Sequence, residues 1–416
     1  MKGMQKRVCM IVYAFYESDT RVMQYAKALV ERGDVVDVLA LRRDERSLFE
    51  IIDGVNVFRI QSRKVDERGR LAHLVRILRF LVVAAVWVTK KHLGKAYDVV
   101  HVHSVPDFLV FAAIVPKLLG SRVILDIHDI LPEFYASKFN VPLDSPLVRL
   151  LLLIERVSGR FADHVIVANH LWRERLIARS LAPEKCSAII NYPDSQIFRP
   201  QPKANKEAGF RITYPGSLNT HQGLDIAVKA FAGVVDKMPG AEFHLYGEGP
   251  AKDSLIQLTL QLGLQERICF HEFLPTSEVA KIMAASDLAV VPKRASSTFG
   301  NEAASTKIME FMLLGVPVIV SRTAIDSYYH DDSTVRFFES ENVSDLAASM
   351  LQLWREPTLR AQLAANAHEY IRKNDWSEKK FDYLRLVDGT EVGEAHGPEL
   401  SDPVWTSGMT NRQENR

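Results

Sequence analysis

The sequence predicts an α/β protein built from two doubly wound parallel-sheet domains. The chain has 416 residues, which is enough for two or three domains of ordinary size. Apolar runs of strand length alternate with segments of helical spacing along most of the chain, as in a parallel sheet covered by helices on both faces. A polar, turn-rich stretch beginning near residue 191 divides this alternation into two halves.

The N-terminal half begins with a basic segment and an apolar run that together look like the start of a signal peptide. The run is short, and no small-x-small cleavage pattern follows, so we predict a buried first strand instead. Gly33 and Gly120 mark the ends of two predicted helices. The expected strands are 7–14, 35–41, 98–102, 122–127 and 163–167, and the expected helices are 22–32 and 107–119.

The C-terminal half restarts the alternation after a linker predicted over residues 196–209. Its expected strands are 210–214, 241–246, 268–271, 288–291 and 317–321, and its expected helices are 224–235, 253–262, 276–285, 305–314 and 343–354. Residues 389–416 are rich in polar residues and have little periodicity, which predicts a mobile tail.

Composition excludes several classes of protein. Apolar residues make up 47% and charged residues 25%, as in ordinary globular proteins. The net charge of +1 argues against a whole-protein electrostatic interaction with nucleic acid. Three cysteines far apart in the chain argue against a disulfide framework and against a C-x-x-C metal or redox site.

Residues 71–91 are mostly apolar and are flanked by basic residues. Two interpretations remain open: a helix lying on an anionic membrane surface, or a domain helix with one buried face and one solvated basic face. The longest uncharged run here, residues 80–89, is about half of the roughly 20 residues that a membrane-spanning helix needs.

Two glycine turns follow predicted strands in the C-terminal half. The first contains Gly216 and Gly223, and the second contains Gly247 and Gly249. Bare backbone beside the positive end of a helix suits a diphosphate, although each motif alone is more often a simple turn. The second turn has a proline where the dinucleotide fingerprint has its third glycine.

Two carboxylates, Glu302 and Glu310, stand eight residues apart around the start of a predicted helix. Glu302 is expected in the loop and Glu310 in the helix, where Lys307 shares its face, and Ser305 or Thr306 can cap the helix. Carboxylates accept hydrogen bonds from sugar hydroxyls, while a lysine and free amides suit phosphate. A ligand site is therefore expected here, at the carboxyl end of a parallel strand.

A histidine and several carboxylates emerge from a strand end in the other half. His128, Asp129 and Glu133 follow the strand predicted over 122–127 and can position or polarise a sugar in a cleft. His101 and His103 follow another strand in the same way, and at least one of them is expected to pack inside.

In this order the motifs resemble the retaining family 4 glycosyltransferases. The Glu302–Glu310 spacing is similar to the E-x7-E motif of that family, and the two glycine turns, residues 162–167 and residues 315–319 support the resemblance from about residue 8 to 386. It implies the GT-B architecture, in which two Rossmann-like domains face each other across a cleft. The implied domains are 1–195 on the acceptor side and 210–370 on the donor side, with a helix over 371–388 crossing back to the first domain.

The resemblance also implies roles for individual residues. Glu310 is expected to bind the donor ribose and Glu302 the donor sugar, with His128 near the transferred sugar. The predicted catalytic residues are His128 and Glu302; the predicted donor-binding residues are Gly216, Ser217, Gly223, Gly247, Lys293, Arg294, Glu302, Lys307 and Glu310; the predicted acceptor-side residues are Asp19, Arg21, His103 and Asp129.

The chain departs from the family pattern at the diphosphate. Ser217 and Gln222 occupy positions where the family usually has Arg and Lys, so Lys293, Arg294 or Lys307 is expected to meet the phosphate charge. The loop around Glu302 also differs, because Phe299-Gly300 precedes this glutamate instead of following it.

The implied reaction is transfer of a sugar from a nucleoside-diphosphate donor to a saccharide or lipid-linked saccharide in cell-surface or exopolysaccharide synthesis. No Asp-x-Asp occurs in the chain, so we expect metal-independent transfer with no metal site and no cofactor. The expected location is the cytoplasm, with peripheral contact of residues 63–91 and 147–153 with an anionic membrane. The alternatives are a non-catalytic nucleotide-sugar-binding module and a GT-B sugar-nucleotide 2-epimerase.

Overall fold

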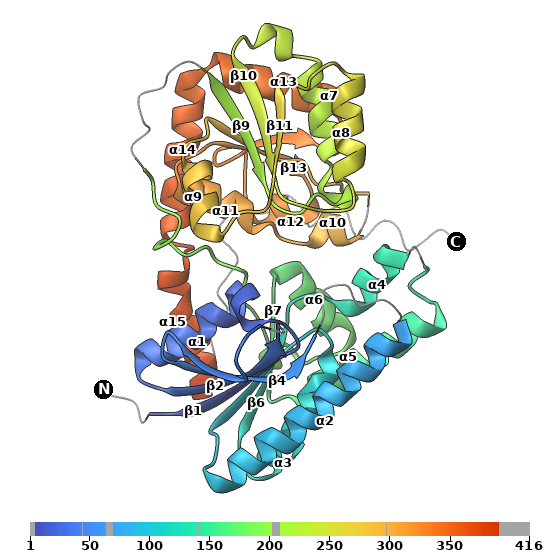
Figure 1. Cartoon of the computed structure of the whole chain (residues 1–416), viewed down its shortest axis with the longest axis vertical. Coiled ribbons are helices and arrows are strands. Elements are labelled where there is room, and N and C mark those ends of the chain that lie inside the picture. Colours follow the sequence, from blue (N-terminus) through green and yellow to red (C-terminus); the bar gives the residue numbers. More distant parts are fainter. Residues whose placement is uncertain are drawn as a thin grey trace.

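A computed structural model describes residues 5–43, 45–63, 70–139, 141–201, 209–296 and 298–390, which form two α/β domains stacked along the long axis of the molecule (Figure 1). Each domain has one sheet, and the strand orders are β3-β4-β2-β1-β5-β6-β7-β8 and β11-β10-β9-β12-β13-β14. In each sheet the order of successive strands reverses direction at a central pair of neighbouring strands. This pair is β1 and β5 in the N-terminal sheet and β9 and β12 in the C-terminal sheet. Open α/β sheets bind ligands at the carboxyl ends of such pairs.

The N-terminal sheet is parallel except at one edge. Its strands are β1 (Arg7–Val12), β2 (Val35–Arg42), β3 (Phe49–Ile52), β4 (Val55–Ser62), β5 (Val99–His103), β6 (Arg122–Ile127), β7 (His164–Val167) and β8 (Cys186–Ala188). Strands β3, β4 and β8 were not predicted from the sequence. Strands β3 and β4 form an antiparallel hairpin, since Asp53 and Gly54 both adopt positive φ, as a two-residue hairpin turn requires.

Helices cover both faces of this sheet. They are α1 (Thr20–Arg32), α2 (Arg70–Gly94), α3 (Ile114–Leu118), α4 (Leu131–Phe139), α5 (Pro146–Phe161) and α6 (His170–Arg179). The single helix predicted over residues 107–119 is wrong: a 3-10 helix, η2 (Asp107–Ala113), precedes the short α3. Pro116 explains the break, because it has no amide to bond the carbonyl of Ala112.

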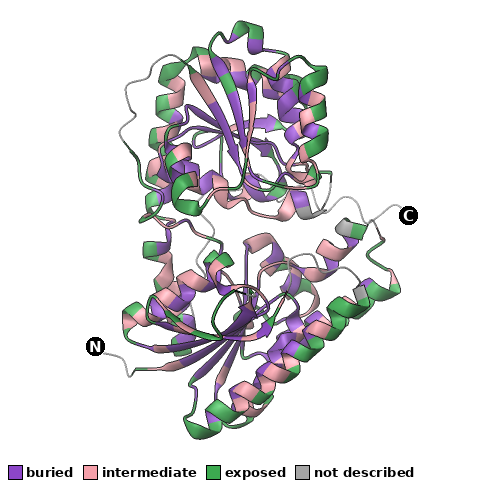
Figure 2. Ribbon diagram, viewed as in Figure 1, coloured by how far each residue is buried: buried purple, intermediate pink, exposed green. Residues whose placement is uncertain are grey.

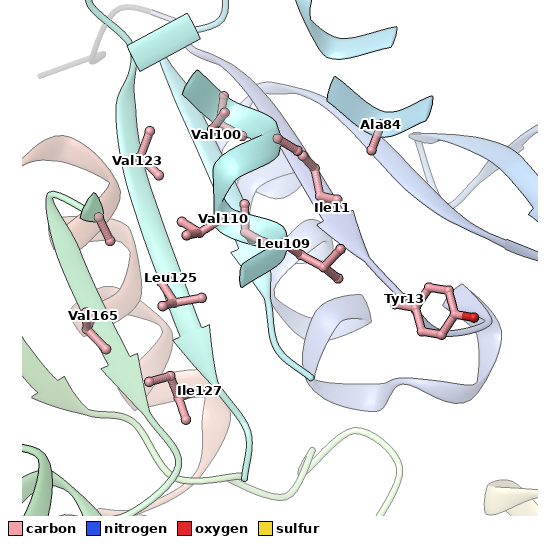
Figure 3. Close-up of a cluster of buried hydrophobic side chains, with 14 of the residues drawn as sticks. Ile11, Tyr13, Ala84, Val100, Leu109, Val110, Val123, Leu125, Ile127 and Val165 are labelled. Carbon is pink, nitrogen blue, oxygen red and sulfur yellow. The ribbon is translucent and has the colours of Figure 1, made fainter. Parts of the chain in front are cut away.

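The core of the N-terminal domain lies on both faces of the sheet. Figure 3 shows one face, where Ile11, Val100, Val123 and Leu125 project from neighbouring strands toward η2 and α2. These strands are buried along almost their whole length (Figure 2), which explains why they read as continuous apolar runs in the sequence.

Helix α2 buries one narrow stripe of apolar side chains and exposes a second apolar stripe. Ile77, Phe80, Ala84 and Val88 pack into the core at helical spacing. Large apolar side chains are exposed along the rest of the helix: Leu71, Leu74, Val75, Leu78, Val82, Val86 and Leu93. By length and composition alone, Leu71–Gly94 is apolar enough to cross a membrane, and only 22% of its 18-residue apolar window is buried.

The C-terminal sheet is parallel throughout. Its strands are β9 (Phe210–Pro215), β10 (Ala241–Tyr246), β11 (Ile268–His271), β12 (Leu288–Val291), β13 (Val318–Arg322) and β14 (Arg336–Glu339). Its helices are α7 (Leu224–Ala232), α8 (Lys252–Gln261), α9 (Thr276–Ala284), α10 (Thr298–Glu302), α11 (Thr306–Leu313), α12 (Ala324–Tyr329), α13 (Val343–Arg355) and α14 (Pro357–Arg372).

The chain crosses between the domains twice, and the two crossings touch. The amide of Trp376 donates to the carbonyl of Pro193 at 3.3 Å. Helix α15 (Trp376–Asp388) then packs on α1 of the N-terminal domain (Figure 1), where Tyr383 stacks on Tyr25 at 4.0 Å between ring centroids. Phe198, inside the predicted linker, is buried in the core of the C-terminal domain. Residues 202–208 of that linker and residues 391–416 of the predicted tail lie outside the described residues.

Candidate active site

A cavity of about 250 Å³ lies between the domains, at the carboxyl ends of both sheets. The N-terminal domain lines it with His128, Asp129, Ala168, Asn169, Trp172 and Asn191, and the C-terminal domain with His221, Gln222, Lys293, Gly300, Ala303, Ala304, Ser305, Thr306, Lys307 and Met309. Four of the predicted site residues, His128, Asp129, Lys293 and Lys307, therefore line one space although they come from different domains.

On the N-terminal side, a buried carboxylate holds the histidine in place. Asp126 at the end of β6 accepts from Nε and Nη2 of Arg21, both at 2.8 Å. The same carboxylate lies 3.0 Å from Nε2 of His128 and 3.1 Å from Nδ1 of His103. Arg21 also donates to the carbonyl of Ile189 at 2.7 Å.

This arrangement changes the expected roles of two acceptor-side residues. Arg21 is 6% exposed and His103 is fully buried, so neither side chain reaches an acceptor in the cavity. Their assignment as acceptor contacts is wrong for a physical reason: both side chains are used to hold Asp126. Both residues lie at the carboxyl ends of β1 and β5, as expected from the sequence. The direction in which each side chain points depends on packing contacts with residues distant in sequence.

The electrostatics of this cluster favour a charged His128. Burial alone would lower the pKa of His128, but attraction to Asp126 and the hydrogen bond between them raise it. Asp19, the N-cap of α1, lies 3.9 Å from the free edge of the ring at Nδ1, beyond hydrogen-bond distance. Because Nε2 faces Asp126, Nδ1 is the nitrogen that can donate to a ligand. Burial raises the pKa of Asp129, and His128 opposes this shift.

On the C-terminal side, Gly216, Gly223 and Gly247 stand at positions where a side chain would meet its neighbours. A Cβ on Gly223 would lie 1.9 Å from the carbonyl oxygen of Pro292, and one on Gly247 would lie 2.0 Å from that of Gly216. A Cβ on Gly216 would meet the side chain of Lys307 at 2.3 Å. All three adopt positive φ, so glycine is required by conformation as well as by space.

Lys307 lies at the start of α11, directly behind Gly216. Its Nζ is 5.4 Å from the centre of the Tyr214 ring. Burial lowers the pKa of Lys307 and attraction to Glu310 opposes the shift. Burial also raises the pKa of Glu310 to about 7, despite Lys307 and a hydrogen bond with Thr306. Ser305 stands at the N-cap, but its side chain makes no hydrogen bond to the amides of the first helical turn. These amides therefore face the cavity without a capping side chain.

The other two predicted phosphate cations already have acidic partners. Nζ of Lys293 lies 2.8 Å from Asp326 and 2.8 Å from the carbonyl of Ala303. Arg294 bonds both oxygens of Asp225 at 2.7 and 2.8 Å and also bonds Glu341. Arg294 thus cross-links the ends of β12, α7 and β14 and does not line the cavity. A contact with the donor phosphate would require this cross-link to open. Ser217 is a turn residue whose carbonyl accepts from Tyr214.

Glu302 is held by the opposite domain. It ends the short helix α10, rather than lying in a loop as expected, and its carboxylate pairs with Arg175 of α6. Its carbonyl accepts from Nδ2 of Asn169 at 3.0 Å. Burial raises the pKa of Glu302, and Arg175 opposes that shift. In this state Glu302 joins the two domains and does not line the cavity.

A second contact between the domains was not predicted. Nδ1 of His170 lies 2.8 Å from the hydroxyl of Tyr329 on α12. Asn169, next to it, caps α6 by accepting from the amide of Trp172 at 2.8 Å. The Asn-His pair just after β7 is a recognisable N-cap signal, but nothing in the sequence indicates its partner 160 residues away.

Two family models together match most of the chain. The glycosyl transferase 4-like domain matches residues 18–191, and glycosyl transferases group 1 matches residues 195–370. The chain belongs to the group 1, family 4-type glycosyltransferases. The boundary between the two matches falls at the first crossing between the domains of this glycosyltransferase.

Known proteins similar to this glycosyltransferase include a plant enzyme and two bacterial structures. Sulfoquinovosyl transferase SQD2 of Arabidopsis thaliana is 25% identical over 291 residues, which are 67% of this chain and 54% of that protein, so the chain spans about half the length of this relative. Sucrose-phosphate synthase from Thermosynechococcus elongatus has a TM-score of 0.72 at 17% identity, over 92% of this chain and 99% of that one.

The third comparison is a structure with a bound ligand. Anabaena HepE, solved in complex with UDP-glucose, has a TM-score of 0.68 at 17% identity, over 92% of this chain and 100% of that one. At these identities the structural likeness establishes the fold, which is GT-B. The glycosyltransferase thus has two Rossmann-like domains that face each other across the cavity described above.

Proposed function

We propose that this glycosyltransferase transfers a sugar from a nucleoside diphosphate to a saccharide or lipid-linked saccharide with retention of configuration. The observation that carries the proposal is the position of Lys307, which lies at the helix end behind Gly216 and across the cavity from His128. A lysine and open helix amides attract the diphosphate. HepE was solved with UDP-glucose, so UDP-glucose is the first donor to test.

The residues suggest how transfer proceeds. Lys307 and the α11 amides would neutralise the charge that develops on the leaving diphosphate. Nδ1 of His128 would donate to a hydroxyl of the transferred sugar, and Asp126 fixes the ring for this contact. In front-face transfer the donor phosphate helps to remove the acceptor proton, so no protein nucleophile is required. Glu310 would accept from the ribose.

Thermal shift with UDP and UDP-glucose tests donor binding. A ligand that binds the folded state raises the melting temperature. We expect a shift for wild type that is lost in Glu310→Ala and in Lys307→Met, and retained in Lys281→Ala, an exposed lysine of α9 paired with Glu278. Equal shifts in all four proteins would refute the assignment of the donor site.

We further propose that the transfer reaction itself uses neither a metal ion nor a cofactor. The expectation is that transfer with UDP-glucose and an acceptor extract continues after EDTA treatment. Loss of transfer in EDTA that magnesium restores would contradict it.

The acceptor side supports a cytoplasmic enzyme bound peripherally to a membrane. The exposed apolar stripe of α2 carries the exposed basic residues Arg79, Lys90 and Lys91. Helix α5, which packs against η2 as α2 does, exposes Leu147, Leu150 and Leu153. Because α2 buries its other stripe in the domain, it fits lying in the membrane surface, where a lipid-linked saccharide in cell-surface or exopolysaccharide synthesis would be reached.

One observation favours a second candidate, a non-catalytic nucleotide-sugar-binding module. Glu302 is paired with Arg175, and Ser217 and Gln222 replace the usual diphosphate cations. This candidate predicts a thermal shift with UDP-glucose but no turnover with any acceptor. Change of the sugar in the donor alone would instead indicate a 2-epimerase.

A further inference from the structure

The edge of the C-terminal sheet carries a group of metal-ligating side chains that the proposed reaction does not use. Along β10, Phe243 and Leu245 point into the core, so Glu242, His244 and Tyr246 occupy the other face. None of these residues lines the interdomain cavity.

Strand β11 adds two residues to the same face. Ile268 and Phe270 pack with the core, which directs Cys269 and His271 to the opposite side. The strands are parallel, with His244 opposite Cys269 in the register. As a result, a ligand atom of His244, one of Cys269 and one of His271 all lie within 4.8 Å of one another.

A carboxylate orients the central histidine. Oε2 of Glu242 lies 3.0 Å from Nε2 of His244, which fixes the proton on that nitrogen and leaves the lone pair on Nδ1. Nδ1 in turn lies 3.0 Å from Nε2 of His271. A carboxylate behind a ligating histidine is a recurrent arrangement in metal sites.

We propose that His244, Cys269 and His271 bind one zinc ion, with the fourth position open to water. Two nitrogens and one thiolate suit zinc, at about 2.0–2.1 Å for each nitrogen and about 2.3 Å for sulfur. At those lengths a tetrahedral site separates two nitrogens by roughly 3.3 Å, against 3.0 Å between Nδ1 of His244 and Nε2 of His271. The two rings must therefore part slightly and turn so that both lone pairs face the ion.

The protonation states are compatible with binding. Burial lowers the pKa of His244, and the hydrogen bond with Glu242 opposes this shift. Burial and the neighbouring His244 lower the pKa of His271, so both shifts favour the neutral rings that bind zinc. Burial raises the pKa of Cys269, so zinc binding would release its proton.

The ion would stabilise the edge of the sheet rather than take part in transfer. It ties β11 to β10 immediately before the glycine turn, where the amide of Gly247 donates to the carbonyl of His271 at 3.2 Å. Strand β11 is the outermost strand of its sheet.

Metal titration of the full chain tests the site. After chelation and desalting, we expect calorimetry to give one Zn²⁺ per chain, and Co²⁺ to give a thiolate-to-metal charge-transfer band. Cys269→Ser should abolish the band and lower zinc affinity at least tenfold. Glu242→Gln, a change at a half-exposed side chain that leaves all three ligands, should lower affinity roughly 10–100-fold.

Cys186→Ser, which removes a buried thiol on β8, is the matched control and should leave the band and the stoichiometry unchanged. The proposal is overturned if wild type binds no zinc, or if the band or affinity survives in Cys269→Ser. It is also overturned if Glu242→Gln binds as tightly as wild type.

Discussion

Arg21 bonds both carboxylate oxygens of Asp126 at 2.8 Å, and both side chains are buried. The pair links the start of α1 to the end of β6 and fixes the acid against which His128 lies. Burial would raise the pKa of Asp126, but Arg21 and His128 hold it well below its usual range. The position of His128, the proposed contact to the transferred sugar, therefore depends on Arg21, which lies outside the cavity.

Replacing Arg21 with methionine should destabilise the N-terminal domain by about 3 kcal/mol, because it leaves a buried carboxylate without its main partner. Urea denaturation measures the loss. Lys27→Ala removes an exposed ion pair from the same helix and should cost less than about 1 kcal/mol. Equal losses in the two variants would show that the Arg21 pair adds no more than a surface contact.

Much of the fold was predictable because the buried strands are apolar on both faces. The strands at residues 241–246, 268–271 and 288–291 were predicted with the bounds that the structure has. The β3–β4 hairpin was missed although Asp53-Gly54 is a strong turn signal, since its strands are half-exposed and lack a continuous apolar run.

The sequence predicts which residues lie near the site, but it does not predict which of their side chains point into the cavity. Glycine turns and strand ends located Gly216, Gly247, Lys307 and His128 at the carboxyl edges of the sheets. Whether a charged side chain faces the cavity depends on partners distant in sequence. Arg294 meets Glu341 from β14's end and Glu302 meets Arg175, and neither pairing has a local sequence signal.

Substitution of Gly247 tests whether the two glycine turns need to lie in close contact. Alanine at this position would place Cβ 2.0 Å from the carbonyl oxygen of Gly216 at a positive φ, so the two turns must separate. We expect a loss of about 2–4 kcal/mol in the stability of the C-terminal domain, with weakened nucleotide binding. Denaturation and UDP titration measure these effects. Gly94→Ala, which has open space around its Cβ, should be neutral or stabilising by up to about 1 kcal/mol, and a comparable loss there would contradict the steric argument.

The raised pKa of Glu310 predicts that the stability of the protein depends on pH. Its pKa in the folded protein is about 7, above its ordinary value of 4.5, so between these values the unfolded chain loses a proton that the folded chain keeps. The stability of the free enzyme therefore falls as pH rises through this window, and the full cost is present above pH 7.

Glu310→Gln should remove that cost. Its advantage over wild type should be near zero at pH 4.5 and reach about 2–3 kcal/mol at pH 8, measured by urea denaturation without nucleotide. Glu369→Gln, an exposed residue of α14, should show no such pH trend. A constant difference between Glu310→Gln and wild type at all pH values would count against a raised pKa.

The exposed stripe of α2 predicts membrane binding. Leu78→Glu with Val82→Glu places two charges on this surface without touching the buried stripe, so it should abolish co-flotation with anionic phosphatidylglycerol vesicles and leave the melting temperature nearly unchanged. Leu260→Glu introduces one such charge at an exposed leucine of α8 in the other domain and should bind vesicles like wild type. Absence of wild-type binding at any salt concentration would refute the membrane proposal.

Arg175 decides whether Glu302 can reach a donor. Arg175→Ala frees the Glu302 carboxylate, while Glu133 keeps its bond to Arg179, so the N-terminal domain retains its internal pair. If Glu302 contacts the donor sugar, the enzyme no longer has to break the ion pair between the domains. We then expect donor affinity to rise by up to about fivefold, since one ion pair contributes up to roughly 1 kcal/mol.

Donor affinity and turnover together separate the two roles of Glu302. Glu302→Gln should lower kcat in a transfer assay, and Glu174→Ala, a change at an exposed residue on the same helix as Arg175, should alter neither quantity. If Arg175→Ala instead loses turnover while donor affinity stays the same, the pair is needed to hold the domains together during catalysis. The contact of Glu302 with Arg175 would then be its working position, and the donor sugar would have to be held from elsewhere in the cavity.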